Sequence, residues 1–261
     1  MTKSNNAVET NNLSISWGEL NVLNKINFKL IKGDKLAIVG PSGSGKSTIL
    51  KILAGLILPT EGKLKIFGEE QTYLRLDQNN PPDVRLVFQN PALLGSLTIE
   101  ENVGFILQRN RTLSKKFIQE TVRECLEEVG LFNVEKKLPN ELSGGMQKRV
   151  SFARALITEQ DLNKNNHPLL LFDEPTAGLD PIASSRIEDL INKTNNKANG
   201  SSIVVSHVLS TIERTSNKVL MLYGGKFRWG GSIDEFKKSN DPYVFQFRNG
   251  KLAGPMQPKD I

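Results

Sequence analysis

The sequence predicts an α/β fold with a mainly parallel sheet, an antiparallel β-subdomain at the N-terminus and an inserted α-helical subdomain. Three observations support this prediction. Apolar and polar residues alternate near the N-terminus, short apolar runs alternate with helical segments further along, and the hydrophobic period changes between about residues 91 and 145. A chain of 261 residues, 38% of them hydrophobic, is long enough to bury a sizeable core in one large domain or two small ones.

Antiparallel strands are predicted for the first part of the chain. Residues 1–12 are polar and rich in asparagine, so we expect them to be frayed. The alternation that predicts strands begins at Leu13–Trp17 and recurs at Ile26–Leu30.

Two series of strands and helices follow, and they predict the parallel sheet. The first has a short apolar strand at Lys35–Val39 and a helix at Thr48–Leu56. The second has apolar segments at Leu169–Phe172, Ile187–Ile191, Ser202–Val205 and Val219–Tyr223. Two asparagine-rich stretches, Asn163–His167 and Asn192–Gly200, are predicted to be surface loops.

The segment between the two series predicts an amphipathic helix with a polar outer face. Apolar residues recur there at helical spacing, at Ile118, Val122, Leu126 and Val129. We therefore expect an inserted group of helices at about residues 91–145.

Composition excludes several classes of protein. A single cysteine, Cys125, excludes an intrachain disulfide and a multi-cysteine metal site. The most apolar stretch, Ile49–Leu58, is too short to cross a bilayer, and the polar start predicts no signal peptide. The net charge of +6 suits an anionic ligand, a nucleic acid or an acidic membrane face without choosing among them. We expect the chain to act at a membrane only through a partner.

The strongest chemical signal is a phosphate-binding loop of the pattern G-x-x-x-x-G-K-[ST], between the strand predicted at 35–39 and the helix predicted after it. Its residues are Gly40, Pro41, Ser42, Gly43, Ser44, Gly45, Lys46 and Ser47. Glycines allow backbone N–H groups to surround phosphate oxygens, and the start of the helix at Thr48 adds a positive dipole end. Lys46 supplies a positive charge for the β- and γ-phosphates, and the Ser47 hydroxyl suits Mg²⁺. The alternative, a glycine-serine turn with a solvated lysine, is disfavoured by the strand–loop–helix context.

Two carboxylates end a predicted buried strand. Asp173 and Glu174 follow the apolar run Leu169–Phe172, and such an ending is costly unless a cation or a reacting group lies there. Asp173 is suited to hold the hydration shell of Mg²⁺, and Glu174 to orient and deprotonate an attacking water. An acidic helix N-cap is the alternative, which the phosphate loop disfavours.

A third motif relates the sequence to a family. Leu142, Ser143, Gly144 and Gly145 precede a predicted helix, where a serine hydroxyl and glycine N–H groups form a second anion-binding face. Together with the two earlier motifs, it resembles the LSGG signature of the ATP-binding cassette family, although Met146 stands where the family has glutamine. The resemblance implies a P-loop NTPase core over residues 13–230, a C-terminal extension over 231–261, ATP hydrolysis, and ATP and Mg²⁺ as cofactors.

The resemblance also assigns roles to residues that have no distinctive pattern of their own. Gln89 resembles the Q-loop glutamine that contacts Mg²⁺ and water, and Asp180 resembles the D-loop aspartate that crosses the dimer. His207 resembles the switch histidine that faces the γ-phosphate, and Trp17 occupies the place of the aromatic residue that stacks on adenine. Taken alone, each has an ordinary alternative: a polar loop residue, a turn, a structural histidine and a core tryptophan.

The resemblance further implies partners. Two copies would enclose two ATP molecules, because the phosphate loop of one subunit meets the LSGG motif of the other. An integral membrane permease would dock near Gln89 at about residues 90–107, with this chain on the cytoplasmic or stromal face of the membrane. Packing within the core explains the apolar residues of that stretch equally well.

Within the family, the sequence resembles the Mla-type lipid-transport ATPases and their chloroplast relatives. The segments ELSGGMQKR and EPTAGLDPIASS and the tail QFRNGKLAGP carry this resemblance. It implies movement of phospholipid or glycolipid and a lipid-binding substrate-binding subunit. An ATPase of a small-solute, amino-acid-type importer shares every catalytic motif and remains an alternative. A soluble ATPase of DNA repair or chromosome organisation fits poorly, because its zinc cysteines or long coiled coil find no place between Gln89 and Ser143. No nucleic-acid partner is therefore expected.

Overall fold

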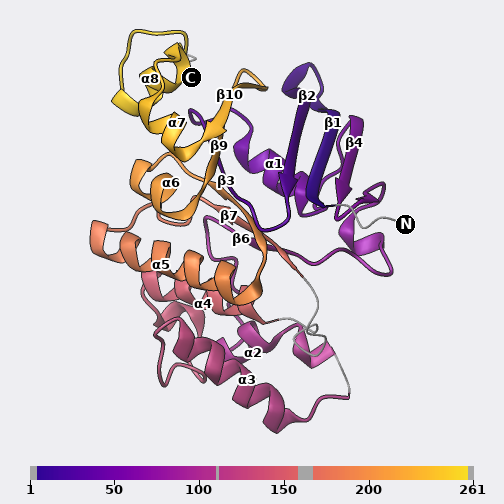
Figure 1. Ribbon diagram of the computed structural model, residues 1–261. Coiled ribbons are helices and arrows are strands. Elements are labelled where there is room, and N and C mark those ends of the chain that lie inside the picture. The colour runs from indigo at the N-terminus through magenta and orange to yellow at the C-terminus, as the bar shows by residue number, and fades with distance from the viewer. Residues whose placement is uncertain (1–4, 110–111, 158–166, 258–261) are drawn as a thin grey trace.

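Two β-sheets organise the chain in a computed structural model, which describes residues 5–109, 112–157 and 167–257 (Figure 1). The smaller sheet contains, in spatial order, β2 (Leu20–Ile31), β1 (Asn6–Trp17), β4 (Glu61–Ile66) and β5 (Glu69–Glu70). The larger contains β10 (Lys226–Ser232), β9 (Lys218–Tyr223), β3 (Lys35–Val39), β8 (Ser201–Val205), β7 (Leu169–Asp173) and β6 (Val84–Val87). Every neighbouring pair in the smaller sheet is antiparallel, and only the β10–β9 pair is antiparallel in the larger. The predicted fold class is confirmed.

Helices fill the space around the larger sheet in three groups. Helix α1 (Lys46–Leu53) lies between the two sheets (Figure 1) and packs its buried leucines and isoleucines against both of them. The opposite face of the larger sheet shares one apolar core with α2 (Ile99–Gly104), α3 (Lys115–Glu128), α4 (Gly144–Leu156) and α5 (Pro181–Ala198), in which α2 and α3 pack on α4. A third core joins β3 and β9 to α6 (Leu209–Thr215), α7 (Ile233–Lys238) and α8 (Pro242–Asn249). The sheet is therefore apolar on both faces, as a mainly parallel sheet requires.

The predicted amphipathic helix corresponds to α3. Val122 and Leu126 are fully buried, and Ser114 caps the helix by accepting a hydrogen bond from the Phe117 N–H. Among the described residues, no helix combines the length and apolar character needed to cross a bilayer.

Two predictions of irregular structure are wrong. Residues 6–12 belong to β1 rather than to a frayed end, because Ala7 and Val8 are fully buried and Val8 pairs with both Leu30 and Ile66. Asn192–Gly200 is mostly the last part of α5, which ends at Ala198 and is followed by Asn199 in a left-handed conformation (φ 47°). Tertiary partners explain the second error: the buried Asn195 side chain donates to Ser202 Oγ at 3.0 Å. Residues 163–166 of the other predicted loop lie outside the described residues.

Buried Asn102 holds together the loop that precedes α2. Its Nδ2 donates to the carbonyls of Leu94, Leu97 and Thr98, each at 3.0 Å, and its Oδ1 accepts from the Leu94 N–H at 2.7 Å. The Asn102 side chain is only 1% exposed, and these bonds satisfy its buried polar atoms.

We expect Asn102→Ala to lower the free energy of unfolding by about 2–3 kcal/mol, because it removes a buried amide that makes four hydrogen bonds to the backbone of this loop. Denaturant titration measures the change, and Asn249→Ala is the matched control, since that exposed amide makes a single bond to Phe245 O. Equal stability of the two variants would contradict the role given to Asn102.

Candidate functional site

The predicted phosphate loop connects β3 to α1 and is shaped by glycines. Gly40 and Gly45 have φ angles of 149° and 98°, which disfavour other residues. A Cβ at Gly40 would lie 2.1 Å from Leu222 O, and one at Gly45 would lie 2.8 Å from Leu23 Cδ2. Because the loop fits so closely against neighbouring chain, its backbone is held in a turned conformation before any ligand binds.

Lys46 lies within this loop and is almost completely buried. Its Nζ donates to the carbonyls of Gly40 and Pro41, each at 2.8 Å. Burial lowers the pKa of Lys46, while the nearby charges of Glu174 and Asp173 oppose that shift. The buried hydroxyl of Ser44 makes no hydrogen bond with the described residues. The loop thus holds a cation and an unused hydroxyl inside a turn of backbone, an arrangement suited to phosphate oxygens.

Ser47 and Asp173 come together from α1 and β7. The Ser47 hydroxyl donates to Asp173 Oδ1 at 2.9 Å. Burial raises the pKa of Asp173 despite this hydrogen bond, and the charge of Glu174 adds to the shift. Hydroxyl and carboxylate oxygens are ligands that Mg²⁺ accepts. No group of three or more His, Cys, Asp or Glu residues is arranged to hold a metal in the described part of the chain. A magnesium ion at this pair would therefore take its other ligands from phosphate and water.

The raised pKa of Asp173 predicts that Asp173→Asn stabilises the nucleotide-free protein near neutral pH. The folded state holds the proton more tightly than the unfolded state does, so ionisation of the carboxyl disfavours folding. The gain in stability from Asp173→Asn should be complete above the folded-state pKa of Asp173 and should disappear below its unfolded-state pKa. Thermal unfolding of both proteins at several pH values measures this, with exposed Asp77→Asn as control. A lower unfolding temperature for Asp173→Asn at neutral pH would contradict the prediction.

Glu174 and His207 meet because β7 and β8 are neighbours in the sheet. Glu174 Oε1 lies 2.9 Å from His207 Nδ1, and the Glu174 N–H donates to Val205 O at 2.9 Å. Glu174 has a left-handed backbone (φ 44°), a strained conformation for a residue with a side chain. Its Oε2 is buried and makes no hydrogen bond with the described residues. One carboxylate oxygen is thus held in place and the other is left to accept a proton, as a general base requires.

Lys148 is a site residue that the sequence did not reveal. It lies on α4, and its Nζ donates to the carbonyls of Pro175, at 3.5 Å, and Ala177. Burial lowers the pKa of Lys148, and the charge of Glu174 opposes the shift. The side chain therefore joins the helix that follows the LSGG motif to the segment that follows Glu174. In the sequence, the only sign of a role for Lys148 was its position just after the LSGG motif, because a lysine on a helix is usually solvated.

Four other predicted side chains are exposed, those of Trp17, Gln89, Ser143 and Asp180, whereas Thr48 is buried on α1 just after the phosphate loop. Ser143 caps α4 by accepting from the Met146 N–H at 3.3 Å, with Gly144 and Gly145 as its first residues. Asp180 caps α5 through the N–H groups of residues 182 and 183. Trp17 is 54% exposed, and Gln89 is exposed just after β6. Among the described residues, no hydrogen bond joins these four side chains to the phosphate loop. Ser143 therefore also serves as a helix cap, and Asp180 caps α5, where a turn was its alternative. The alternative of a core tryptophan is wrong for Trp17.

A cavity of about 590 Å³ borders the outer turn of the phosphate loop. Its walls are residues 20–22, 41–44 and 223–225, together with Gln257. The Gln257 N–H donates to the Tyr223 hydroxyl at 3.1 Å. The C-terminal segment of the same chain therefore reaches the edge of the loop.

This loop, placed at the end of a parallel strand and beside the acidic end of β7, defines the class of P-loop nucleotide hydrolases. Residues 23–177 match the family model described as ABC transporter, and the chain belongs to that family. The family identifies the chain as an ATP-hydrolysing subunit.

Relatives and solved structures agree with this family. The chain is 44% identical to Protein TRIGALACTOSYLDIACYLGLYCEROL 3, chloroplastic, of Arabidopsis thaliana, over 96% of this chain and 75% of that protein. It is 33% identical to the Intermembrane phospholipid transport system ATP-binding protein MlaF of Haemophilus influenzae, over 97% and 94% of the two chains. Among solved structures, the dimeric post-hydrolysis state of the ATP-binding cassette MJ0796 bound to ADP and Pi superposes with a TM-score of 0.74 and 28% identity, over 87% of this chain and 98% of that one.

Proposed function

We propose that two copies of this chain hydrolyse ATP at shared sites and thereby drive lipid transport through a separate membrane permease. The observation that carries the proposal is the division of the site. Lys46, Ser47, Asp173, Glu174 and His207 gather around the phosphate loop, whereas the second anion-binding face at Ser143 lies exposed on α4. A second copy can supply that face, and the dimeric relative bound to ADP and Pi supports this arrangement.

In this proposal each side chain has a defined task. The phosphate loop and Lys46 bind the β- and γ-phosphates, and Trp17 stacks on the adenine. Ser47, Asp173 and Gln89 hold Mg²⁺, which balances the charge of the phosphates when it is bound. Glu174 takes a proton from the attacking water, and His207 keeps the Glu174 carboxylate in place.

Residues of the second copy complete the site. Ser143, Gly144 and Gly145 contact the terminal phosphate from the partner, and Asp180 crosses between the copies. Because that contact depends on the terminal charge, its loss on hydrolysis opens the dimer.

The permease contact is proposed for the segment between Gln89 and α2. Leu94 and Phe105 are exposed there, at 45% and 49%. The same segment is tied to α4, because Arg154 donates to the carbonyls of Pro91 and Ala92 at 3.1 and 2.9 Å. A shift of the permease against this segment would therefore be transmitted to the helix that carries the LSGG motif.

The lipid assignment rests on the two relatives described above, whose names state a glycerolipid or a phospholipid system. It includes a lipid-binding substrate-binding subunit and a position on the cytoplasmic or stromal face of the membrane.

Affinity purification of the tagged chain from its own membranes, followed by mass spectrometry of proteins and lipids, tests the assignment. We expect to recover a multispanning permease, a lipid-binding subunit and glycerolipid. A matched purification of Lys46→Ala is the control, and glycerolipid in excess over that control would show that lipid recovery depends on nucleotide. Recovery of a permease with an amino-acid-binding protein and no enriched lipid would favour the small-solute importer instead.

A further inference from the structure

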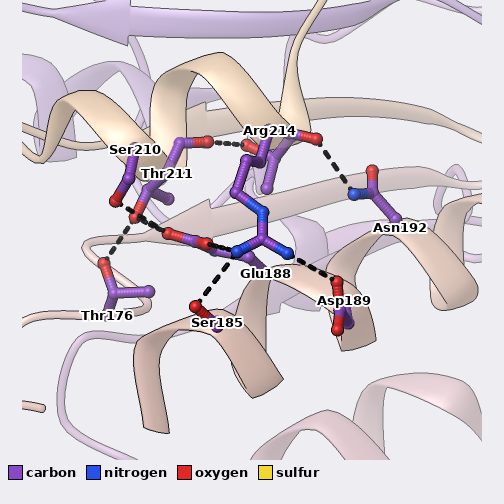
Figure 2. A network of polar contacts seen from close by, with 9 residues as sticks. Thr176, Ser185, Glu188, Asp189, Asn192, Ser210, Thr211 and Arg214 are labelled. Atoms are coloured by element: carbon purple, nitrogen blue, oxygen red, sulfur yellow. Dashed lines mark hydrogen bonds and ion pairs between the residues drawn. The ribbon is translucent and has the colours of Figure 1, made fainter. Parts of the chain in front are cut away.

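A network of polar contacts joins the loop after Glu174 to helices α6 and α5 (Figure 2). At its centre is Glu188 on α5, whose side chain is only 1% exposed. Its Oε1 accepts hydrogen bonds from Thr211 at 2.8 Å and Ser210 at 3.1 Å, both on α6. Its Oε2 pairs with Arg214 of α6 at 3.1 Å. Burying a carboxylate is costly, and these charge-assisted contacts offset the cost only while α5 and α6 keep this relative position.

The network extends from Thr211 to the loop that follows Glu174. Thr211 Oγ1 lies 2.9 Å from Thr176 Oγ1, and both side chains are buried. Thr211 has one hydroxyl hydrogen and donates it to Glu188, so Thr176 must donate to Thr211. The hydrogen bonds therefore run in one direction, from the loop of Thr176 through α6 to the carboxylate on α5.

This chain of bonds spans the segments that position Glu174, His207 and Asp180. Thr176 lies two residues after Glu174, and α6 begins two residues after His207. Helix α5 begins directly after Asp180. The start of α6 has no side-chain cap at Val208, and the helix has only seven residues. Its placement must therefore come from tertiary contacts.

We propose that Glu188 and Thr211 are positioning residues for ATP hydrolysis, which fix the Thr176 loop and α6 relative to each other and so keep Glu174 in contact with His207. The proposal rests on the function proposed above. The strained backbone of Glu174 makes such support necessary, because a left-handed residue returns to an extended or helical conformation when its surroundings loosen.

Thr211→Val is the sharpest test, because it removes the hydroxyl and keeps the shape of the side chain. We expect kcat for ATP hydrolysis to fall about tenfold, with the Kd for ATP changed less than about twofold. Amide hydrogen exchange of residues 174–180 should become faster, since the Glu174 and Ala177 N–H groups form bonds that hold this loop. Thr211→Ser keeps the hydroxyl and should retain most of the parental kcat.

Thr215→Val is the matched control. Thr215 is a buried threonine on the same helix, and its hydroxyl donates to Thr211 O within that helix. We expect parental kcat and parental exchange of residues 174–180 in this variant. Thr176→Val breaks the network from the other side while leaving Glu188 satisfied, and it should reproduce the loss in kcat if Thr211→Val fails to fold.

Two outcomes would overturn the proposal: a folded Thr211→Val protein with parental kcat, or an equal loss of kcat in Thr215→Val. The second would show a general effect of packing in α6. If Glu174 were not the general base, Glu174→Gln would keep its ATP turnover. That result is distinct from the two outcomes above, which concern only the positioning role of Glu188 and Thr211.

Discussion

Glu174→Gln is expected to lower ATP turnover by about 10²–10⁴-fold, the range contributed by a positioned general base. Glutamine has nearly the same shape as glutamate and keeps an oxygen at the place of Oε1, but its amide does not accept a proton from water at neutral pH. ATP should still bind, because Lys46 and the phosphate loop are unchanged. With the terminal phosphate uncleaved, the two copies should remain together.

Single-turnover hydrolysis, nucleotide binding and size-exclusion chromatography with light scattering measure these three effects. Glu213→Gln is a suitable control, because Glu213 pairs with Lys237 at the surface. Parental turnover in Glu174→Gln would remove Glu174 as the base. A variant that stays monomeric with ATP and Mg²⁺, also in the presence of the permease, would contradict the shared site.

Lys46→Ala is expected to reduce hydrolysis by at least about 10²-fold and to weaken ATP binding as well. The substitution removes the only side-chain cation found inside the phosphate loop in the described structure. It also leaves the carbonyls of Gly40 and Pro41, which accept from Lys46 at 2.8 Å, without that donor. The two effects act on the same loop, so nucleotide affinity and kcat should both fall.

Fluorescence titration with a labelled ATP analogue and a phosphate-release assay distinguish binding from hydrolysis. Lys51→Ala is the control on the same helix, since Lys51 lies exposed in its last turn, and its turnover should change less than about twofold. Unchanged turnover in Lys46→Ala would contradict the assignment of the phosphate loop.

Local sequence was sufficient to predict the phosphate loop and the strands that bear function. The loop depends on glycines and a lysine within eight consecutive residues, and the strands Lys35–Val39 and Leu169–Asp173 are short, continuous apolar runs. The prediction for α1 was less accurate at its ends, because the helix begins at Lys46 and stops at Leu53 rather than spanning Thr48–Leu56. Helix ends depend on a few backbone hydrogen bonds that apolar periodicity does not specify.

Predictions made from local composition were wrong where contacts with distant residues determined the secondary structure or the burial of a side chain. Asparagines predict loops, yet Asn195 is buried in α5 through its bond to Ser202, and Asn6 begins a strand that lies between two others. Lys148 and Glu188 were missed for the same reason. A charged residue on a helix normally faces solvent, and only packing against a distant loop or helix gives these two residues their polar partners.

The sequence by itself determined the chemistry available to this protein: a backbone cradle for phosphate, a lysine, a pair of carboxylates and a serine-glycine helix start. Only the tertiary structure decided which of these groups meet. Glu174 and His207 are 33 residues apart and come within 2.9 Å because their strands are neighbours in one sheet. Ser143 remains exposed at the start of α4. Motifs are encoded by neighbouring residues, whereas distances between motifs follow from strand order and from buried contacts between residues far apart in the chain.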